Sequence, residues 1–280
     1  MASSSSNLSS SVVHLAEVSW NCYNFTGPMV WCVCSIPCTG VGLPACVWLL
    51  WELIKRKHSG SANTYMLNLT VMDLVFNIFL LPTALNYFLF RNALLRKICF
   101  IASSFNVSGR PLFTACVCVD CYMAVVRPIT YMKTRNSRYA VVVSVVVWSV
   151  VLACGTLIMI REDLVAVFTV TVCTLALPTI TFCDIFILRT LRKPDPSGRA
   201  DVHPQKQRAL QTITNSLVIT VMAYLPPLVL EVFSALMPLS PMEVLCNIEV
   251  PVRIACMLGS TLMPLLHLEN MGSFQDLRRC

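Results

Sequence analysis

Two opposite charges inside apolar sequence are the residues with the most chemistry to explain. Asp73 ends the run LNLTVMD, and Arg110 lies in GRPLFTACVCV, with apolar side chains around both. An ionised group away from water needs a partner, because burying an unpaired charge is costly. We therefore expect each of them to be paired inside the fold.

No group of residues indicates catalysis or a metal site. Cys32, Cys34 and Cys38 are closely spaced, but neither a histidine nor a carboxylate lies near them, and cysteines inside apolar runs commonly behave as small hydrophobic residues. No serine–histidine or cysteine–histidine arrangement recurs at usable spacing. We expect no enzyme activity, no cofactor and no metal.

The composition is that of a polytopic membrane protein. Of 280 residues, 56% are hydrophobic and 12% charged, and the mean hydropathy is +0.70, whereas about a quarter of residues are charged in soluble domains. In a membrane protein the net charge of +7 indicates how the chain is oriented across the bilayer, so nucleic-acid binding is not expected.

Seven apolar windows are long enough to span a bilayer, which takes about 20 residues. The sequence thus predicts an all-α, seven-helix membrane bundle. The windows lie at 29–54, 63–89, 99–126, 138–160, 164–191, 208–236 and 247–268.

Basic residues orient this bundle. About 15 of the 21 lysines and arginines fall on one face, which the positive-inside rule assigns to the cytosol; Arg91, Arg96 and Lys97 argue mildly against it. We expect an extracellular tail at 1–28, the bundle at 29–268 and a short cytosolic tail at 269–280. The cytosolic basic residues are Lys55, Arg56, Lys57, Arg127, Lys133, Arg135, Arg138, Arg189, Arg192, Lys193, Arg199, Lys206, Arg208, Arg278 and Arg279.

Motifs along the chain resemble those of the rhodopsin-like (class A) G-protein-coupled receptors. GLPACVWLLW resembles GLPxNxxxLW, LNLTVMDL resembles LNLAxADL, VDCYMAVVRP resembles DRYxAVVxP, and GSTLMPLLHL resembles GSxxNPxxY. Trp148, Pro178 and AYLPP stand where the fourth, fifth and sixth helices of the family keep a tryptophan and prolines. GRPLF is most similar to nucleotide-receptor-like orphan receptors.

The resemblance implies a set of switch residues, several of which depart from the family pattern. Cys46 and Met263 replace asparagines, Cys121 replaces the arginine of DRY, and His267 replaces the tyrosine of NPxxY. A thiol cannot replace a guanidinium with five donors. The switch positions are Asp73, Arg110, Asp120, Cys121, Tyr122, Tyr224, Pro226, Pro264 and His267.

The same resemblance places Asp73 at the family's sodium site and Arg110 at matching depth. We predict an ion pair between them that takes the place of the ion and joins the second helix to the third. The alternative is that Arg110 faces a water-filled cavity or reaches backbone carbonyls.

Ligand contacts are expected at the outer end. Arg253, about three turns above Pro264, lies at a level that often binds ligands in nucleotide-receptor-like proteins and would suit an anion. Glu231 and Glu249 could equally neutralise it. Further candidates are Asn86, Tyr87 and Arg96.

Covalent modifications are expected on the same topology. The branch that the chain resembles often joins cysteines placed like Cys22 and Cys246, and Cys22 with Cys99 is the competing disulfide. Asn7 and Asn24 are glycosylation acceptors if the N-terminal region is outside. Cys280, beside two arginines, either carries a palmitoyl group or is a free thiol.

The resulting prediction is a plasma-membrane receptor that senses an extracellular ligand and signals through a heterotrimeric G protein. A decoy or degenerate receptor that has lost coupling is the alternative. A retinal protein would need a lysine in 248–268, which has none, and a duplicated transporter would show a repeat. Membrane lipids are expected partners, and nucleic acid is not.

Overall fold

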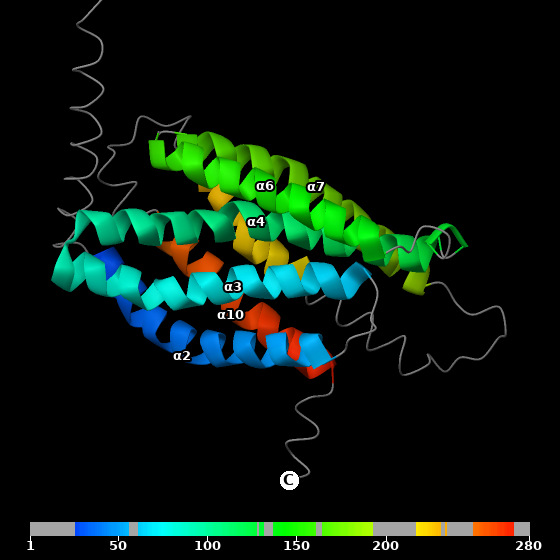
Figure 1. Cartoon of the computed structure of the whole chain (residues 1–280), viewed down its shortest axis with the longest axis horizontal. Helices are drawn as coiled ribbons and strands as arrows, with labels where there is room; N and C mark the ends of the chain where they lie inside the picture. The colour runs from blue at the N-terminus through cyan, green and yellow to red at the C-terminus, as the bar shows by residue number, and fades with distance from the viewer. Residues whose placement is uncertain are drawn as a thin grey trace, which may run out of the picture.

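The structure, a computed structural model, is an all-α bundle of long helices (Figure 1). The described residues are 26–55, 61–127, 129–131, 137–160, 164–192, 217–230, 233 and 249–271. The labelled elements are α2 (Thr26–Lys55), α3 (Ser61–Leu85), the π-helical turn η2 (Asn86–Phe90), α4 (Ala93–Val126), α6 (Ser137–Ile160), α7 (Leu164–Arg192) and α10 (Glu249–Asn270).

Six helices in the described ranges are long and apolar enough to cross a membrane. They coincide with six of the seven predicted windows. At the place of the sixth window the structure describes a shorter apolar helix, Leu217–Leu230, while 208–216 and most of 231–236 lie outside the described residues.

α4 is the central helix. It packs against α3 on one side and against α6 and α7 on the other, while α2 packs against both α3 and α10 (Figure 1). Residues from helices far apart in the sequence therefore meet around α4. This arrangement sets the location of the candidate site.

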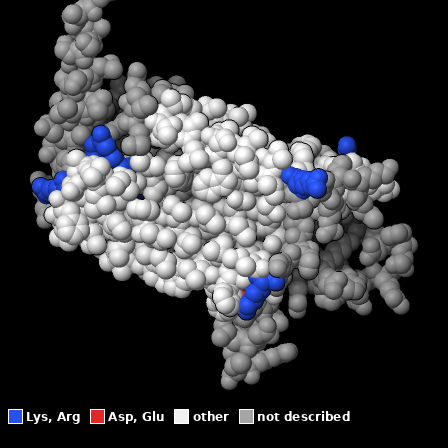
Figure 2. Space-filling view, in the orientation of Figure 1, with Lys and Arg blue, Asp and Glu red and all other residues white. Residues whose placement is uncertain are grey.

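The surface of the bundle is apolar where lipid would lie. In Figure 2 the lysines and arginines in view stand toward the two ends of the molecule, with an uncharged band between them. On α6 the exposed side chains include Val141, Val145 and Val146, while the alanine at Ala140 is buried. Small residues inside and large apolar residues outside are typical of membrane helices, where lipid gives no hydrophobic drive for helices to associate.

The turn between α3 and α4 differs from the sequence prediction. α4 begins at Ala93 rather than at 99, because the Asn92 side chain caps it by accepting from the N–H groups of Leu94 at 2.9 Å and Leu95 at 3.2 Å. Arg91 has a left-handed backbone, with φ of 49°. Arg96 and Lys97 thus lie in the first turns of the helix, not in a loop.

Candidate functional site

Asp73 and Arg110 form an ion pair at the centre of the bundle. The Nε of Arg110 lies 3.3 Å from Oδ1 of Asp73, and each side chain is 2% exposed. α3 supplies the carboxylate and α4 the guanidinium, and these two helices pack along much of their length. The predicted contact between the second and third spans is therefore present.

α10 completes the cluster from the opposite side. Nη1 of Arg110 donates to Oγ of Ser260 at 3.1 Å, and Nη2 donates to the carbonyl of Gly259 at 2.6 Å. Asn106 donates to the same Ser260 hydroxyl at 2.9 Å and to Asp73 at 3.3 Å. Arg110 thus binds both the Asp73 carboxylate and a backbone carbonyl. The predicted ion pair is present, and so is the carbonyl contact that was its alternative.

Gly259 lies in close contact with the Arg110 side chain and with the helix Leu217–Leu230. A Cβ built on it would lie 2.9 Å from Nη1 of Arg110 and 2.9 Å from Cβ of Ala223. No contact with Arg110 was predicted for Gly259, Ser260 or Asn106, although the first two begin the motif GSTLMPLLHL. Their signal was two small residues just before Thr261, on the last span, together with an amide one turn before Arg110.

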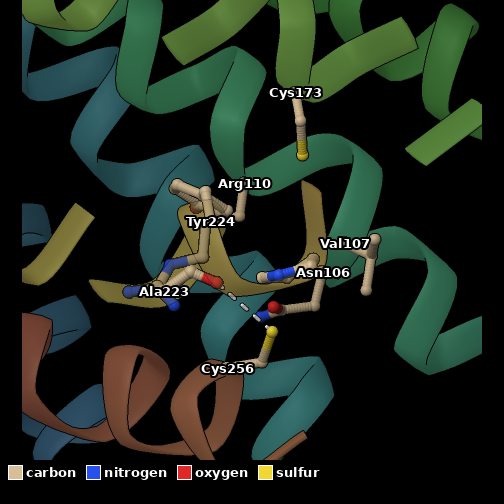
Figure 3. Close-up of a pocket in the computed structure, with 8 residues that line it drawn as sticks. Asn106, Val107, Arg110, Cys173, Ala223, Tyr224 and Cys256 are labelled. Atoms are coloured by element: carbon tan, nitrogen blue, oxygen red, sulfur yellow. Dashed lines mark hydrogen bonds between the residues drawn. The ribbon is translucent and has the colours of Figure 1, made fainter. Parts of the chain in front are cut away.

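A small cavity adjoins Arg110 (Figure 3). It has room for about one water molecule. The thiol of Cys256 donates to the carbonyl of Ala223 at 3.5 Å, and the ring of Tyr224 lies 6.0 Å from the Arg110 guanidinium carbon. The lining residues are Asn106, Val107, Arg110, Cys173, Ala223, Tyr224, Pro227 and Cys256.

Asn77 of α3 connects the region around Asp73 to α2. The Asn77 amide donates to the carbonyl of Asp73 at 2.8 Å and to the Cys46 sulfur at 3.8 Å. A Cβ on Gly42 would lie 2.5 Å from Oδ1 of Asn77, so these two helices also need a glycine at their contact. Cys46 is fully buried and accepts only a weak hydrogen bond in this position.

At the predicted inner end, Asp120 is held by neutral groups. Ser61 donates to its Oδ1 at 2.5 Å, and Tyr131 donates to its Oδ2 at 3.2 Å. The hydroxyls of Ser61 and Tyr131 are 3.3 Å apart. The start of α3, the end of α4 and the segment after it are joined here without a guanidinium.

Cys121 lies beside two carboxylates. Asp120 and Asp184 are both within electrostatic reach of it, and Asp184, buried on α7, accepts a hydrogen bond from the Cys118 thiol. The neighbouring Tyr122 points to an aromatic pair on α7, with ring centroids 6.1 Å from Phe182 and 6.2 Å from Phe186. An arginine at 121 would meet negative charge from both α4 and α7.

The other switch positions occupy α10 and the helix Leu217–Leu230. Met263 is buried, and Pro264 and His267 lie within α10, where the carbonyl of His267 accepts from the N–H of Met271 at 3.0 Å. Pro226 is partly buried in the shorter helix. These residues lie on different helices from Asp120 and do not join its cluster.

At the predicted outer end, Asn86 forms hydrogen bonds within the turn between α3 and α4, and its predicted ligand contact stays a prediction. Its amide donates to the carbonyl of Asn92 at 3.1 Å, and its Oδ1 accepts from the Asn92 N–H at 2.9 Å. Asn86 is buried. Its hydrogen-bonding groups therefore hold the turn between α3 and α4.

Three other predicted ligand-contact residues, Tyr87, Arg96 and Arg253, lie in the described part of the chain. Tyr87, half-buried on η2, is within electrostatic reach of Arg253 on α10 and of Arg91. Arg96 is half-buried in the first turn of α4. Glu231 and the side chain of Glu249 lie outside the described residues. The alternative that one of them neutralises Arg253 therefore stays a prediction.

The covalent predictions fall mostly outside the described residues. Cys99 is a buried, free thiol, and Cys22, its partner in the competing disulfide, lies outside the described residues. Within the described part of the chain, no group of three or more histidine, cysteine or acidic residues could hold a metal ion. The remaining predicted sites that lie outside are Asn7, Cys22, Asn24, Cys246 and Cys280.

Comparison with known proteins agrees with the motifs. Residues 45–179 match the model of the 7 transmembrane receptor (rhodopsin family). The chain is 37% identical over 115 residues to lysophosphatidic acid receptor 6 of Gallus gallus, covering 40% of this chain and 37% of that one. It is 33% identical over 131 residues to human G-protein coupled receptor 68, covering 45% and 36%, and 30% identical over 120 residues to a purinoceptor of Xenopus laevis, covering 41% and 22%.

These matches confirm the predicted resemblance and the helical membrane fold. Together with the apolar helices, they confirm a multi-pass protein of the plasma membrane, which over residues 45–179 is similar to a family of receptors rather than of enzymes. The matched part of the chain spans about a third of the length of the lysophosphatidic acid receptors of chicken and mouse.

Proposed function

On the premise that the chain belongs to the rhodopsin family, which residues 45–179 match, we propose that it is a cell-surface receptor for an extracellular phosphorylated anion. Binding would shift the population between closed and open inner ends and so activate a heterotrimeric G protein. Two relatives have names that refer to lysophosphatidic acid and to purines. Lysophosphatidic acid carries a phosphate, and a purine does so when it is part of a nucleotide.

One observation carries this proposal. The turn η2 and the helix α10 bring Tyr87 within electrostatic reach of both Arg253 and Arg91, and Arg253 is exposed. Arginine and tyrosine can together donate several hydrogen bonds to phosphate oxygens, and an arginine does so in a bidentate geometry. The predicted outer end therefore suits a phosphate monoester.

The test is binding and signalling by the full chain at the cell surface. A lysophosphatidic acid and a series of nucleoside di- and triphosphates would be added separately, with G-protein dissociation measured by energy transfer. We expect one of the two classes to bind, and Arg253→Ala to weaken it about 10-fold or more, as for the loss of a charge-assisted contact. Lys97→Ala is the control, since Lys97 is exposed on a different helix. No binding by either class, or equal effects of the two substitutions, would remove the proposal.

A receptor that binds without signalling is a second candidate, favoured by the inner end. Cys121 has no charge, and Asp120 is already held by Ser61 and Tyr131. Cys121→Arg adds a guanidinium next to two carboxylates, while Cys121→Ser is the uncharged control. Binding with G-protein activation only in Cys121→Arg would support this candidate, and activation by the native chain would exclude it.

A further inference from the structure

We propose that the end of α7 near Arg189 carries a binding site for an anionic phospholipid of the bilayer. Arg189 binds the phosphate, and the acyl chain lies along the exposed apolar face of the same helix. The site is on the outside of the bundle, so it does not depend on which ligand binds at the predicted outer end.

Arg189 is an exposed cation at the edge of an apolar span. It lies in the last turns of α7, next to the end of the span Val170–Thr190, and belongs to the predicted cytosolic face. Its guanidinium carbon is 5.9 Å from the ring centroid of Phe186, a distance typical of a cation–π contact. Among the described residues, no carboxylate forms a salt bridge with it. An arginine can bind phosphate oxygens through two parallel hydrogen bonds, so Arg189 suits a lipid phosphate.

The lipid-facing side of α7 provides a surface for the acyl chain. Phe182 is 53% exposed and Ile185 is 39% exposed. Phe182 lies seven residues before Arg189, which is two turns and about 10 Å along the helix axis. The hydrocarbon part of one leaflet is about 15 Å thick. A chain attached to a phosphate at Arg189 can therefore contact both apolar side chains within its own leaflet.

The rings beside Arg189 are held by the contact between α7 and α4. The ring centroids of Phe182 and Phe186 are 4.4 Å apart, and that of Tyr122 on α4 lies 6.1 and 6.2 Å from them. Tyr122 in turn packs against a buried cluster that α4 and α7 share. Because these rings are already packed, binding a lipid costs little additional ordering of side chains.

Net charge decides which phospholipid is preferred. Phosphatidylcholine is neutral overall, because its choline balances its phosphate, whereas phosphatidylserine carries a net negative charge. A basic residue near the membrane surface attracts anionic lipids by about fivefold in population. We therefore expect phosphatidylserine to be enriched about fivefold over phosphatidylcholine beside Arg189.

The experiment measures tryptophan fluorescence of the full chain in nanodiscs, with Phe182→Trp as a reporter at a lipid-facing position. Each nanodisc contains equal amounts of phosphatidylserine and phosphatidylcholine, and only one of the two is brominated, since bromine quenches a tryptophan that it contacts. The signal of the chain without the reporter is subtracted, because the sequence has five tryptophans of its own. Brominated phosphatidylserine should quench the reporter more strongly, by an amount that corresponds to about fivefold enrichment.

Three variants of the reporter chain test the role of Arg189. Arg189→Ala should abolish the preference for phosphatidylserine, and Arg189→Lys should retain it, because the positive charge remains. Lys55→Ala is the matched control: Lys55 is also an exposed basic residue of the predicted cytosolic face, but it lies on α2. This substitution should leave the preference unchanged.

Three results would overturn the proposal. One is equal quenching by the two brominated lipids in the reporter chain. Another is an equal loss of preference in Arg189→Ala and Lys55→Ala, which would mean that the charge of the whole surface attracts the lipid. The third is quenching by neither lipid, which would mean that a second copy of the chain covers this face.

Discussion

At the scale of single residues, the interior cluster depends on what is small as much as on what is charged. Because Gly259 has no side chain, the end of the Arg110 side chain can reach its carbonyl, which accepts from Arg110 at 2.6 Å. Replacing a charged residue by an apolar one would leave its partner buried and unpaired, which is typically more costly than the pair is stabilising. The cluster therefore depends both on the paired charges and on the absence of a side chain at Gly259.

We predict that Gly259→Ala destabilises the chain by about 1–3 kcal/mol, because its methyl group would lie 2.9 Å from both Ala223 and Arg110. The measurement is the free energy of unfolding in mixed micelles. Gly40→Ala is the matched control: nothing lies within 4 Å of its Cβ position, so alanine should be neutral or stabilise the helix by up to about 1 kcal/mol. Equal changes for the two would show that packing at Gly259 is not tight.

At the scale of helices, α3 and α6 are joined by a polar contact in an otherwise apolar interface. Nε1 of Trp148 donates to Oδ1 of Asn68 at 2.8 Å, and Asn68 donates to Ser144 at 3.2 Å. The Trp148 ring also lies 6.1 Å from that of Phe113 on α4. Tryptophan in this place links three helices.

We predict that Asn68→Ala and Trp148→Phe each cost about 1 kcal/mol, a typical value for hydrogen bonds between membrane helices. Because both changes remove the same bond, their effects should be less than additive in the double variant. Ser149→Ala is the control, since Ser149 is exposed and bonds to the carbonyl of Val145 on its own helix. Strict additivity would mean that the two side chains act independently.

At the scale of the whole molecule, the charge distribution predicts the orientation of the bundle. The lysines and arginines in view stand toward the ends of the molecule, with an uncharged band between them (Figure 2). In the sequence as a whole, about 15 of the 21 lie on the predicted cytosolic side. The positive-inside rule then places residues 1–28 outside and 269–280 in the cytosol.

An epitope at each terminus tests that orientation. In intact cells an antibody should label the N-terminal epitope, and the C-terminal one only after permeabilisation. A cytosolic marker protein controls for leaky cells. Labelling of the C-terminal epitope in intact cells would reverse the topology and move Arg253 to the cytosolic side, which would also remove the proposed ligand site.

Residue type and position alone were enough for several properties of this protein. Six of the seven predicted spans correspond to long apolar helices, because a preference for lipid over water is a property of each side chain and adds up along a segment. Asp73 and Arg110 needed partners for the same local reason, and motif spacing suggested that they would meet.

The tertiary structure decided where the remaining polar groups went. Arg110 and Ser260 are 150 positions apart, so no local pattern could indicate that α10 completes the cluster. Asn86 bonds to Asn92 in a turn, and Asp120 accepts from Ser61 and Tyr131. A hydrogen bond forms only when the distance between donor and acceptor is right to within a few tenths of an ångström. Those distances exist only once the helices have packed.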